Sequence, residues 1–174
     1  VGDNADAYPN DPTRTQPDDS IGWSGIQGYW RLSSDLGSFG VGPSQFSTAW
    51  WNDTADGVRA ARDCFFDDEV IFGQDGSFTN ILNDETWIEE WQGAESEQCG
   101  TPIAPHDGTV DATYEFDEPA NSLTITGVGA YLVHPRAVNG DELADSTGAP
   151  ASITYNVYPQ TDGTMIVTIE TFVD

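Results

Sequence analysis

The stretch that decides the fold class of this chain is ITYNVYPQTDGTMIVTIE, residues 153–170. Residues 153–158 and 165–170 each alternate between larger apolar side chains and other residues, which is the period of a strand with one buried face. The sequence between them, TDGT at 161–164, is typical of a tight turn. The stretch therefore predicts an antiparallel β-hairpin.

Two more segments show the same pattern toward the amino end. The sequence YEFDEPANSLTI at 114–125 predicts a hairpin around the turn 118–121, and CFFDDEVIFGQDGSFT at 64–79 predicts one around 74–76. Helical periodicity is weak, and the best short candidates are 47–52 and 55–62. Consecutive hairpins predict an all-β fold, an antiparallel meander of about eight strands, as a small closed barrel or a two-sheet β-sandwich.

The charge of the chain restricts its partners. The 174 residues carry 30 acidic side chains against five arginines and no lysine, a net charge of −25 with a pI near 4.1. Nucleic acid, anionic membranes and anionic polysaccharides are usually bound through Lys and Arg, so we expect none of these partners. A neutral ligand, a cation or another protein remains possible.

The composition divides the chain in two. Residues 1–20, VGDNADAYPNDPTRTQPDDS, are an acidic linker rich in Asp and Pro, and residues 21–174 form the all-β module. Cys64 and Cys99 lack a CxxC spacing. In an exported protein we expect them to form a disulfide; two reduced thiols in a cytosolic protein are the alternative.

The tryptophans are the candidate ligand-binding residues. All six lie between Trp23 and Trp91. Trp87 and Trp91 share a face in either a strand or a helix, whereas Trp50 and Trp51 face opposite ways in an extended chain. Indole rings stack on the C–H faces of sugars, and Glu89 and Gln92 could bind hydroxyl groups beside them. The alternative is that these indoles fill a core.

Part of the linker resembles a known calcium-binding repeat. Residues 2–12, GDNADAYPNDP, are similar to the closing half of a thrombospondin type 3 repeat, although the leading DxDxDG half is missing. The resemblance implies that Asp3 and Asp6 hold Ca²⁺ through their carboxylate oxygens. It also implies a secreted, extracellular or cell-surface protein of several modules.

The β-module resembles an accessory module of polysaccharide-degrading enzymes from marine bacteria. The strings that carry the resemblance are VGP (41–43), WW (50–51), WIEEWQG (87–93), CGTPIAPHDG (99–108) and GVGAYL (127–132). In addition, GYWRL at 28–32 is similar to the start of lipocalin-type barrels, where the tryptophan plugs one end.

These resemblances imply a non-catalytic carbohydrate-binding module, covalently linked to a catalytic domain and binding a neutral polysaccharide such as the β-glucan laminarin. The expected ligand-binding residues are Trp50, Trp51, Trp87, Glu89, Trp91, Gln92 and Tyr131.

Other functions remain open on the sequence alone. Paired carboxylates, for which 67–69 and 89–90 supply candidates, would permit glycoside hydrolysis. His106 and His134 lack the spacing of a metal site, and His106 lies in a sequence typical of a turn. A lipocalin-like binder of an apolar small molecule and a structural spacer are the remaining alternatives. We expect no catalytic residues.

Overall fold

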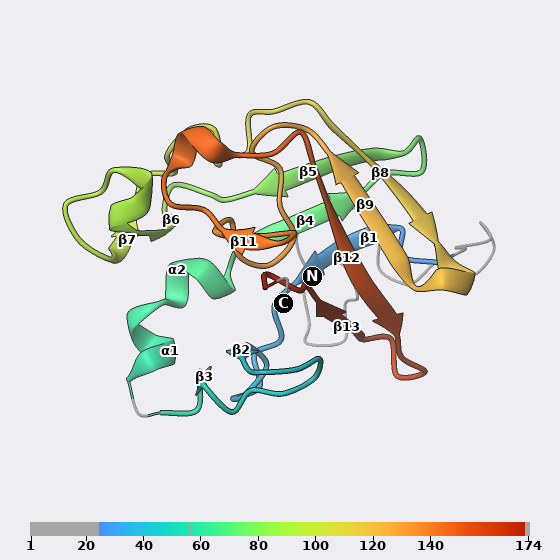
Figure 1. Cartoon of the computed structure of the whole chain (residues 1–174), viewed down its shortest axis with the longest axis horizontal. Coiled ribbons are helices and arrows are strands. Elements are labelled where there is room, and N and C mark those ends of the chain that lie inside the picture. Colours follow the sequence, from blue (N-terminus) through green and yellow to red (C-terminus); the bar gives the residue numbers. More distant parts are fainter. Residues whose placement is uncertain (1–24, 56, 173–174) are drawn as a thin grey trace, which may run out of the picture.

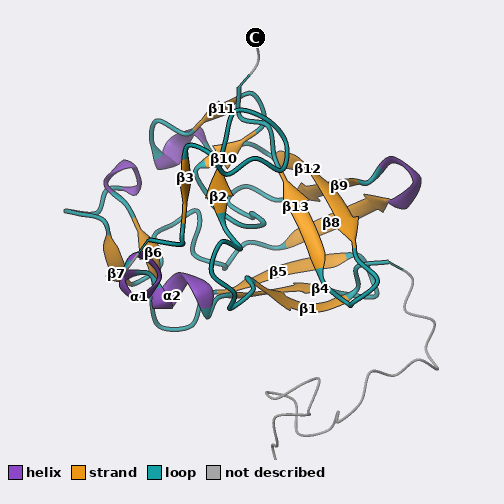
Figure 2. Cartoon of the chain, turned by 90° about the horizontal axis from the view of Figure 1, so that it is seen from below, coloured by secondary structure: helices purple, strands orange, loops and turns teal. Residues whose placement is uncertain are grey.

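The computed structural model describes residues 25–55 and 57–172, and its main element is one antiparallel sheet. Seven strands form it in the order β1-β4-β5-β8-β9-β12-β13. Their bounds are β1 Gly28–Arg31, β4 Glu69–Phe72, β5 Ser77–Ile81, β8 Ala112–Asp117, β9 Ser122–Thr126, β12 Ser152–Pro159 and β13 Met165–Thr168. Figure 2 shows this sheet curling into a half-barrel, with β12 and β13 turned at an angle to β1, β4 and β5.

The smaller elements lie around this sheet (Figure 1). Three strand pairs accompany it: β2 Gly40–Val41 with β3 Trp51–Asn52, β6 Thr86–Ile88 with β7 Gln98–Gly100, and β10 Ala137–Val138 with β11 Asp141–Glu142. Short helices complete the described residues: α1 Val58–Ala61, α2 Asp63–Phe66 and the 3₁₀ turns η1 Glu90–Gln92, η2 Glu118–Ala120 and η3 Ser146–Gly148.

The structure confirms the predicted all-β fold and two of the hairpins in full. In β12 the buried residues are Ile153, Tyr155 and Val157, so alternation places one face of the strand in the core. The turn at 161–164 joins β12 to β13, and the 3₁₀ turn η2 joins β8 to β9. Within the described residues, β1 and β13 are the two edges of the sheet, which forms a half-barrel consistent with the predicted barrel or sandwich.

Two local predictions were wrong. The strand expected from Cys64 begins only at Glu69, because 63–66 form helix α2 and bury Cys64, Phe65 and Phe66 together. A short unbroken apolar run fits a helix as well as a strand, and alternation was absent there. Residues 47–52 are not helical and end in β3, whereas α1 lies within the expected 55–62.

The core has two parts. The larger one fills the concave side of the sheet, where Phe72, Phe78, Leu123, Ile125 and Tyr155 are at most 2% exposed. Trp30 is half-buried and packs against it, and its Nε1–H donates to the Ile26 carbonyl (2.7 Å). The smaller core joins α2 to β6 through Cys64, Phe65, Phe66 and Trp87.

The predicted disulfide is present. Cys64 of α2 and Cys99 of β7 are bonded, with Cα atoms 5.9 Å apart. The bond ties the small β6–β7 pair to the helix beside it. The linker boundary at residue 20, like Asp3 and Asp6, lies outside the described residues.

Replacing both cysteines should lower stability strongly. The cross-link joins residues 35 apart, and the chain-entropy relation then gives roughly 4 kcal/mol of stabilisation. We expect Cys64→Ser/Cys99→Ser to lose about that much free energy of unfolding in urea denaturation. Wild-type protein measured under reducing conditions is the control and should match the variant. An unchanged midpoint for the variant would contradict a stabilising cross-link.

Candidate functional site

The first candidate site is centred on a carboxylate that follows strand β6. Glu89 lies between β6 and the turn η1, and its backbone N–H donates to Oε1 of Gln92 (3.0 Å). This local turn brings Trp87 and Trp91 to the same side of Glu89. We call the residues assembled here the Glu89 cluster: Trp87, Glu89, Trp91, Gln92, His106, Tyr131 and His134.

The Glu89 carboxylate is held by neutral donors and one histidine. The Trp91 Nε1–H donates to Oε2 (2.6 Å), the Trp87 Nε1–H donates to Oε1 (3.2 Å), and His134 Nε2 lies 3.7 Å from Oε1. Burial alone would raise the pKa of Glu89, but the contact with His134 and the two indole hydrogen bonds outweigh it and lower the pKa to about 2. Both oxygens of Glu89 are therefore engaged inside the protein.

The cluster continues through His106 to Tyr131. The His106 ring lies 5.4 Å from Trp91 and 6.2 Å from Tyr131, measured between centroids. Tyr131 is buried under β5, where the Asn80 amide donates to its carbonyl (2.8 Å). Burial lowers the pKa of His106 to about 4, although the nearby negative charge of Asp107 acts to raise it. His106 is therefore a neutral ring near neutral pH.

A second carboxyl lies at the Tyr131 end of the cluster. Asp68 accepts a hydrogen bond from the Thr86 hydroxyl (2.6 Å). Burial raises the pKa of the Tyr131 hydroxyl, and the nearby charge of Asp68 adds to that effect. Burial raises the pKa of Asp68 to about 7. The hydrogen bond from Thr86 acts to lower this pKa, and the negative charge of Asp67 acts to raise it further. Among the described residues, buried Oδ1 of Asp68 and buried Nδ1 of His106 have no hydrogen-bond partner.

The second candidate site is an exposed surface where the hairpin β2–β3 meets β12, β13 and Phe172. Its large side chains are 43–60% exposed: Val41, Phe46, Trp50, Ile166 and Phe172. With Gln45, Tyr158 and Thr168 they form what we call the neutral aromatic face. Phe46 contacts Tyr158 with ring centroids 5.2 Å apart, and Trp50 contacts Phe172 at 6.4 Å. The Gln45 side-chain amide donates to the Tyr158 hydroxyl (2.7 Å) and to Thr168 Oγ1 (3.0 Å).

Most of the segments that build this face contain no charged residue, although Glu170 lies two residues before Phe172. Residues 36–52, 146–161 and 163–169 lack Asp, Glu, Lys and Arg, in a chain of which 20% is charged. Tyr158 and Ile166 are partners across β12 and β13, so both project from the convex side of the sheet. This absence of charge is visible in the sequence, and sequence reasoning missed it because only the positions of charges were considered.

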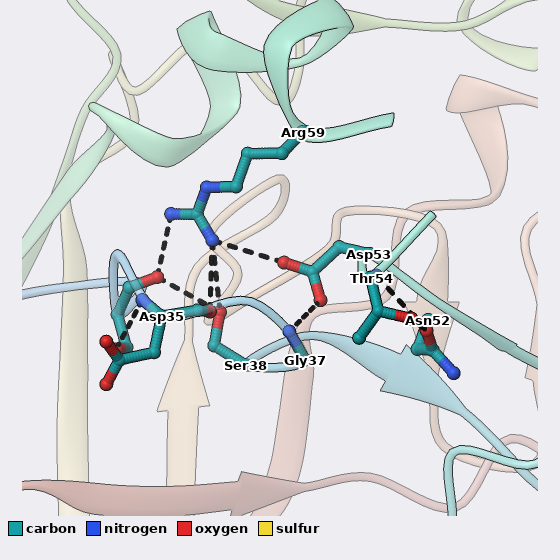
Figure 3. Close-up of polar contacts among 8 residues, drawn as sticks. Asp35, Gly37, Ser38, Asn52, Asp53, Thr54 and Arg59 are labelled. Atoms are coloured by element: carbon teal, nitrogen blue, oxygen red, sulfur yellow. Dashed lines mark hydrogen bonds and ion pairs between the residues drawn. The ribbon is translucent and has the colours of Figure 1, made fainter. Parts of the chain in front are cut away.

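A buried ion pair supports the base of the hairpin (Figure 3). Asp53, which is fully buried, accepts from the Gly37 N–H (2.7 Å) and from Arg59 Nη1 (3.1 Å). Arg59 reaches over from α1 and also donates to the carbonyls of Ser33 (2.8 Å) and Asp35 (3.2 Å). Its guanidinium lies 3.5 Å above the Phe66 ring. Removing Arg59 would leave the fully buried Asp53 carboxylate without an opposite charge.

The hairpin loop itself is tightly folded. The Trp50 N–H donates to the Val41 carbonyl (3.0 Å), and Asn52 is bonded to Thr48 and Thr54. A Cβ at Gly42 would lie 2.2 Å from the Ser47 carbonyl oxygen, so this position requires glycine. Phe46 has a φ of 65°, a left-handed conformation that is costly for a bulky residue. The loop therefore holds an exposed aromatic ring in a strained position.

The predicted ligand-binding residues are divided between these two sites. Trp50 is 59% exposed and belongs to the neutral aromatic face. Trp51 is half-buried against Phe39, with ring centroids 5.5 Å apart. The remaining five belong to the Glu89 cluster, where Trp87, Gln92 and Tyr131 are buried and Glu89 and Trp91 are half-buried. These five residues pack against one another and do not form an exposed surface; their assignment as ligand-binding residues stays a prediction.

Sequence reasoning missed several residues of both sites. Phe46, Tyr158 and Phe172 lie in separate segments, and only the folded hairpin brings them together. The turn predicted at His106–Asp107 is present, since Asp107 accepts from the Thr109 N–H (3.1 Å). Within the described residues, no group of three or more His, Cys, Asp or Glu could hold a metal ion. Calcium at Asp3 and Asp6 stays a prediction.

The Asp68 carboxyl predicts a specific dependence of stability on pH. Its pKa is higher in the folded protein than the usual 3.8, so its favourable contribution is complete below about pH 4 and is lost as pH rises through about 7. We expect Asp68→Asn, which keeps an acceptor for Thr86, to gain a few kcal/mol relative to wild type between pH 4.5 and pH 8. Urea unfolding at several pH values measures this.

Asp67→Asn is the matched control, because it removes one neighbouring charge from an exposed position. It should retain most of the wild-type decline in stability between pH 4.5 and pH 8. A pH-independent difference between Asp68→Asn and wild type would show that Asp68 is not buried as its contacts indicate.

Comparisons with known proteins leave both sites to be judged on their own chemistry. No family model, curated protein or solved structure matches the chain. In the described part of the chain, no helix is both long and apolar enough to span a membrane.

Proposed function

We propose that this chain is a non-catalytic carbohydrate-binding module that binds a neutral polysaccharide at the neutral aromatic face. The observation that carries the proposal is the exposure of Phe46, Trp50 and Phe172, each close to 60%, on a surface built mostly from uncharged segments. Large exposed apolar patches on a folded domain usually mark a binding surface.

The chemistry of the face suits a sugar ligand. Aromatic rings pack against the C–H faces of pyranose rings, and stacking of nucleic-acid bases on aromatic side chains, a comparable contact, contributes roughly 1–3 kcal/mol per ring. Gln45, Tyr158 and Thr168 supply an amide and two hydroxyls between the rings, and these can exchange their mutual hydrogen bonds for bonds to sugar hydroxyls. The loop is already folded by its own hydrogen bonds, which reduces the entropy lost on binding.

The charge distribution supports a neutral ligand over an anionic one. With a net charge of −25, the chain repels alginate-like and sulfated polymers, and the neutral aromatic face offers no arginine to meet them. A neutral β-glucan such as laminarin avoids that repulsion. Because Phe72, Phe78 and Tyr155 fill the concave side of the sheet, the exposed face is better suited to binding than the interior is.

The proposal includes a cellular context. A disulfide suits an oxidising compartment, so we propose a secreted or cell-surface protein. The acidic linker at 1–20 would connect the module to a polysaccharide-degrading catalytic domain, with Ca²⁺ at Asp3 and Asp6 stiffening the connection. Binding would then keep the attached enzyme close to its substrate.

Trp50→Ala tests the proposal. If one indole contributes 1–3 kcal/mol, the Kd for laminarin should rise roughly 5- to 150-fold. Calorimetric titration of laminarin into each protein measures the change. Because Trp50 is exposed, the variant should unfold at close to the wild-type urea midpoint.

Tyr29→Ala on β1 is the matched control, since that side chain is 50% exposed and β1 is the opposite edge of the sheet. It should bind laminarin as wild type does. Equal loss in both variants, or no binding by any of the three proteins, would overturn the proposal.

A second candidate function rests on Glu89 and on Asp68, which lies at the Tyr131 end of the Glu89 cluster. Their surroundings push the pKa values apart, to about 7 for Asp68 and about 2 for Glu89, as a general acid and an ionised partner require in a glycosidase. Against this, both Glu89 oxygens already accept hydrogen bonds from indoles or face His134. We therefore rank hydrolysis below binding.

Reducing-sugar release from laminarin distinguishes the two functions. We expect no release above background from the wild-type chain at pH 5 to 8. Release that Asp68→Asn and Glu89→Gln both abolish, in variants that still fold, would establish the glycosidase instead.

A further inference from the structure

The arrangement of rings on the neutral aromatic face indicates which kind of neutral glycan it can accept. The exposed surface of a crystalline polysaccharide is flat, and its sugar rings lie in one plane. An aromatic surface that binds it must therefore present several rings in one plane. A single glycan chain in solution is twisted instead, and successive sugar rings face in different directions.

The rings here are not coplanar. Phe46 and Tyr158 are tilted by 63° to each other, and Trp50 and Phe172 by 85°. Within each pair, only one ring can lie parallel to any given plane. The pairs are edge-to-face contacts, which stabilise the tilted arrangement itself.

The two ring pairs lie close enough for one chain to reach both. Thr168 contacts Gln45 next to Phe46, and Phe172, which contacts Trp50, follows Thr168 by four residues. Four residues span at most about 14 Å when fully extended. A short oligosaccharide can therefore extend from one pair to the other, and the amide and hydroxyls of Gln45, Tyr158 and Thr168 lie beside the first pair.

Resting on the proposed function, we infer that the neutral aromatic face binds a single, soluble, twisted glycan chain and does not bind crystalline polysaccharide. The Phe46–Tyr158 pair and the Trp50–Phe172 pair are two sugar-binding subsites of different orientation. The hydrogen-bonding groups of Gln45, Tyr158 and Thr168 contact sugar hydroxyls beside the Phe46–Tyr158 pair.

The test compares soluble and crystalline ligands with the same protein. Wild-type chain is titrated with laminarin and with laminarin oligosaccharides of increasing length, and is separately mixed with microcrystalline cellulose and with chitin before centrifugation. We expect saturable binding of laminarin and no depletion by either crystalline polymer. Affinity should rise with oligosaccharide length until both subsites are filled, and then level off.

Phe46→Ala and Trp50→Ala test the two subsites, with Tyr29→Ala as the control for each. The longest oligosaccharides should lose at least 5-fold in affinity with either variant, and the two losses should multiply in the double variant. The control for folding is the thermal unfolding temperature of each variant, which should equal that of the wild type.

The possible failures are distinguishable. Depletion by cellulose or chitin that Trp50→Ala abolishes would overturn the inference and leave the neutral-glycan function intact. If only one of the two variants has a lower affinity for the longest oligosaccharides, the two-subsite arrangement is overturned. Absence of binding to every soluble and crystalline ligand would overturn the proposed function and the inference together.

Discussion

The scarcity of cations is the constraint on which the rest of this structure depends. Thirty carboxylates share five arginines, so most acidic groups that are held in the fold must be held by neutral donors. Glu89 accepts from two indoles. The exposed turns repeat one device, in which an aspartate accepts from the hydroxyl and backbone N–H of a Ser or Thr two residues later; it occurs at Asp75, Asp107, Asp145 and Asp162.

Where the chain does bury an ion pair, the pair supports the hairpin of the proposed binding site. Asp53 and Arg59 join the Gly37 turn, the end of β3 and α1 into one unit. Phe39 then packs against Trp51, Phe65 and His134, which connects the hairpin to the Glu89 cluster. The cluster is thus best understood as a rigid support, and the hairpin that it supports carries the exposed rings.

Sequence reasoning predicted the parts of the fold that depend on local pattern. Alternation and turn residues identified the β8–β9 and β12–β13 hairpins, because burial of one face leaves a period of two. The apolar run Cys64–Phe66 has no such period, and its helical state is decided by packing against Trp87. Local pattern could not reveal this.

The candidate sites were predicted less well, for a physical reason. The spacing of Trp87 and Trp91 correctly placed both indoles on one side, but it could not show that a carboxylate between them would accept both N–H groups. The meeting of Asp68, His106 and Tyr131 depends on the sheet topology. Trp50 was identified from the sequence, whereas its ring partner Phe172, and Tyr158, which contacts Phe46, lie more than a hundred residues farther along the chain.

The central claim is that the ligand contacts the exposed hairpin and not the Glu89 cluster. The most direct test is to follow the six indole N–H resonances by two-dimensional ¹H–¹⁵N NMR as laminarin is added. We predict that the Trp50 resonance shifts until the binding site is saturated with laminarin. The resonances of Trp87 and Trp91, both hydrogen-bonded to Glu89, should stay in place. Shifts at Trp87 and Trp91 with none at Trp50 would contradict this prediction.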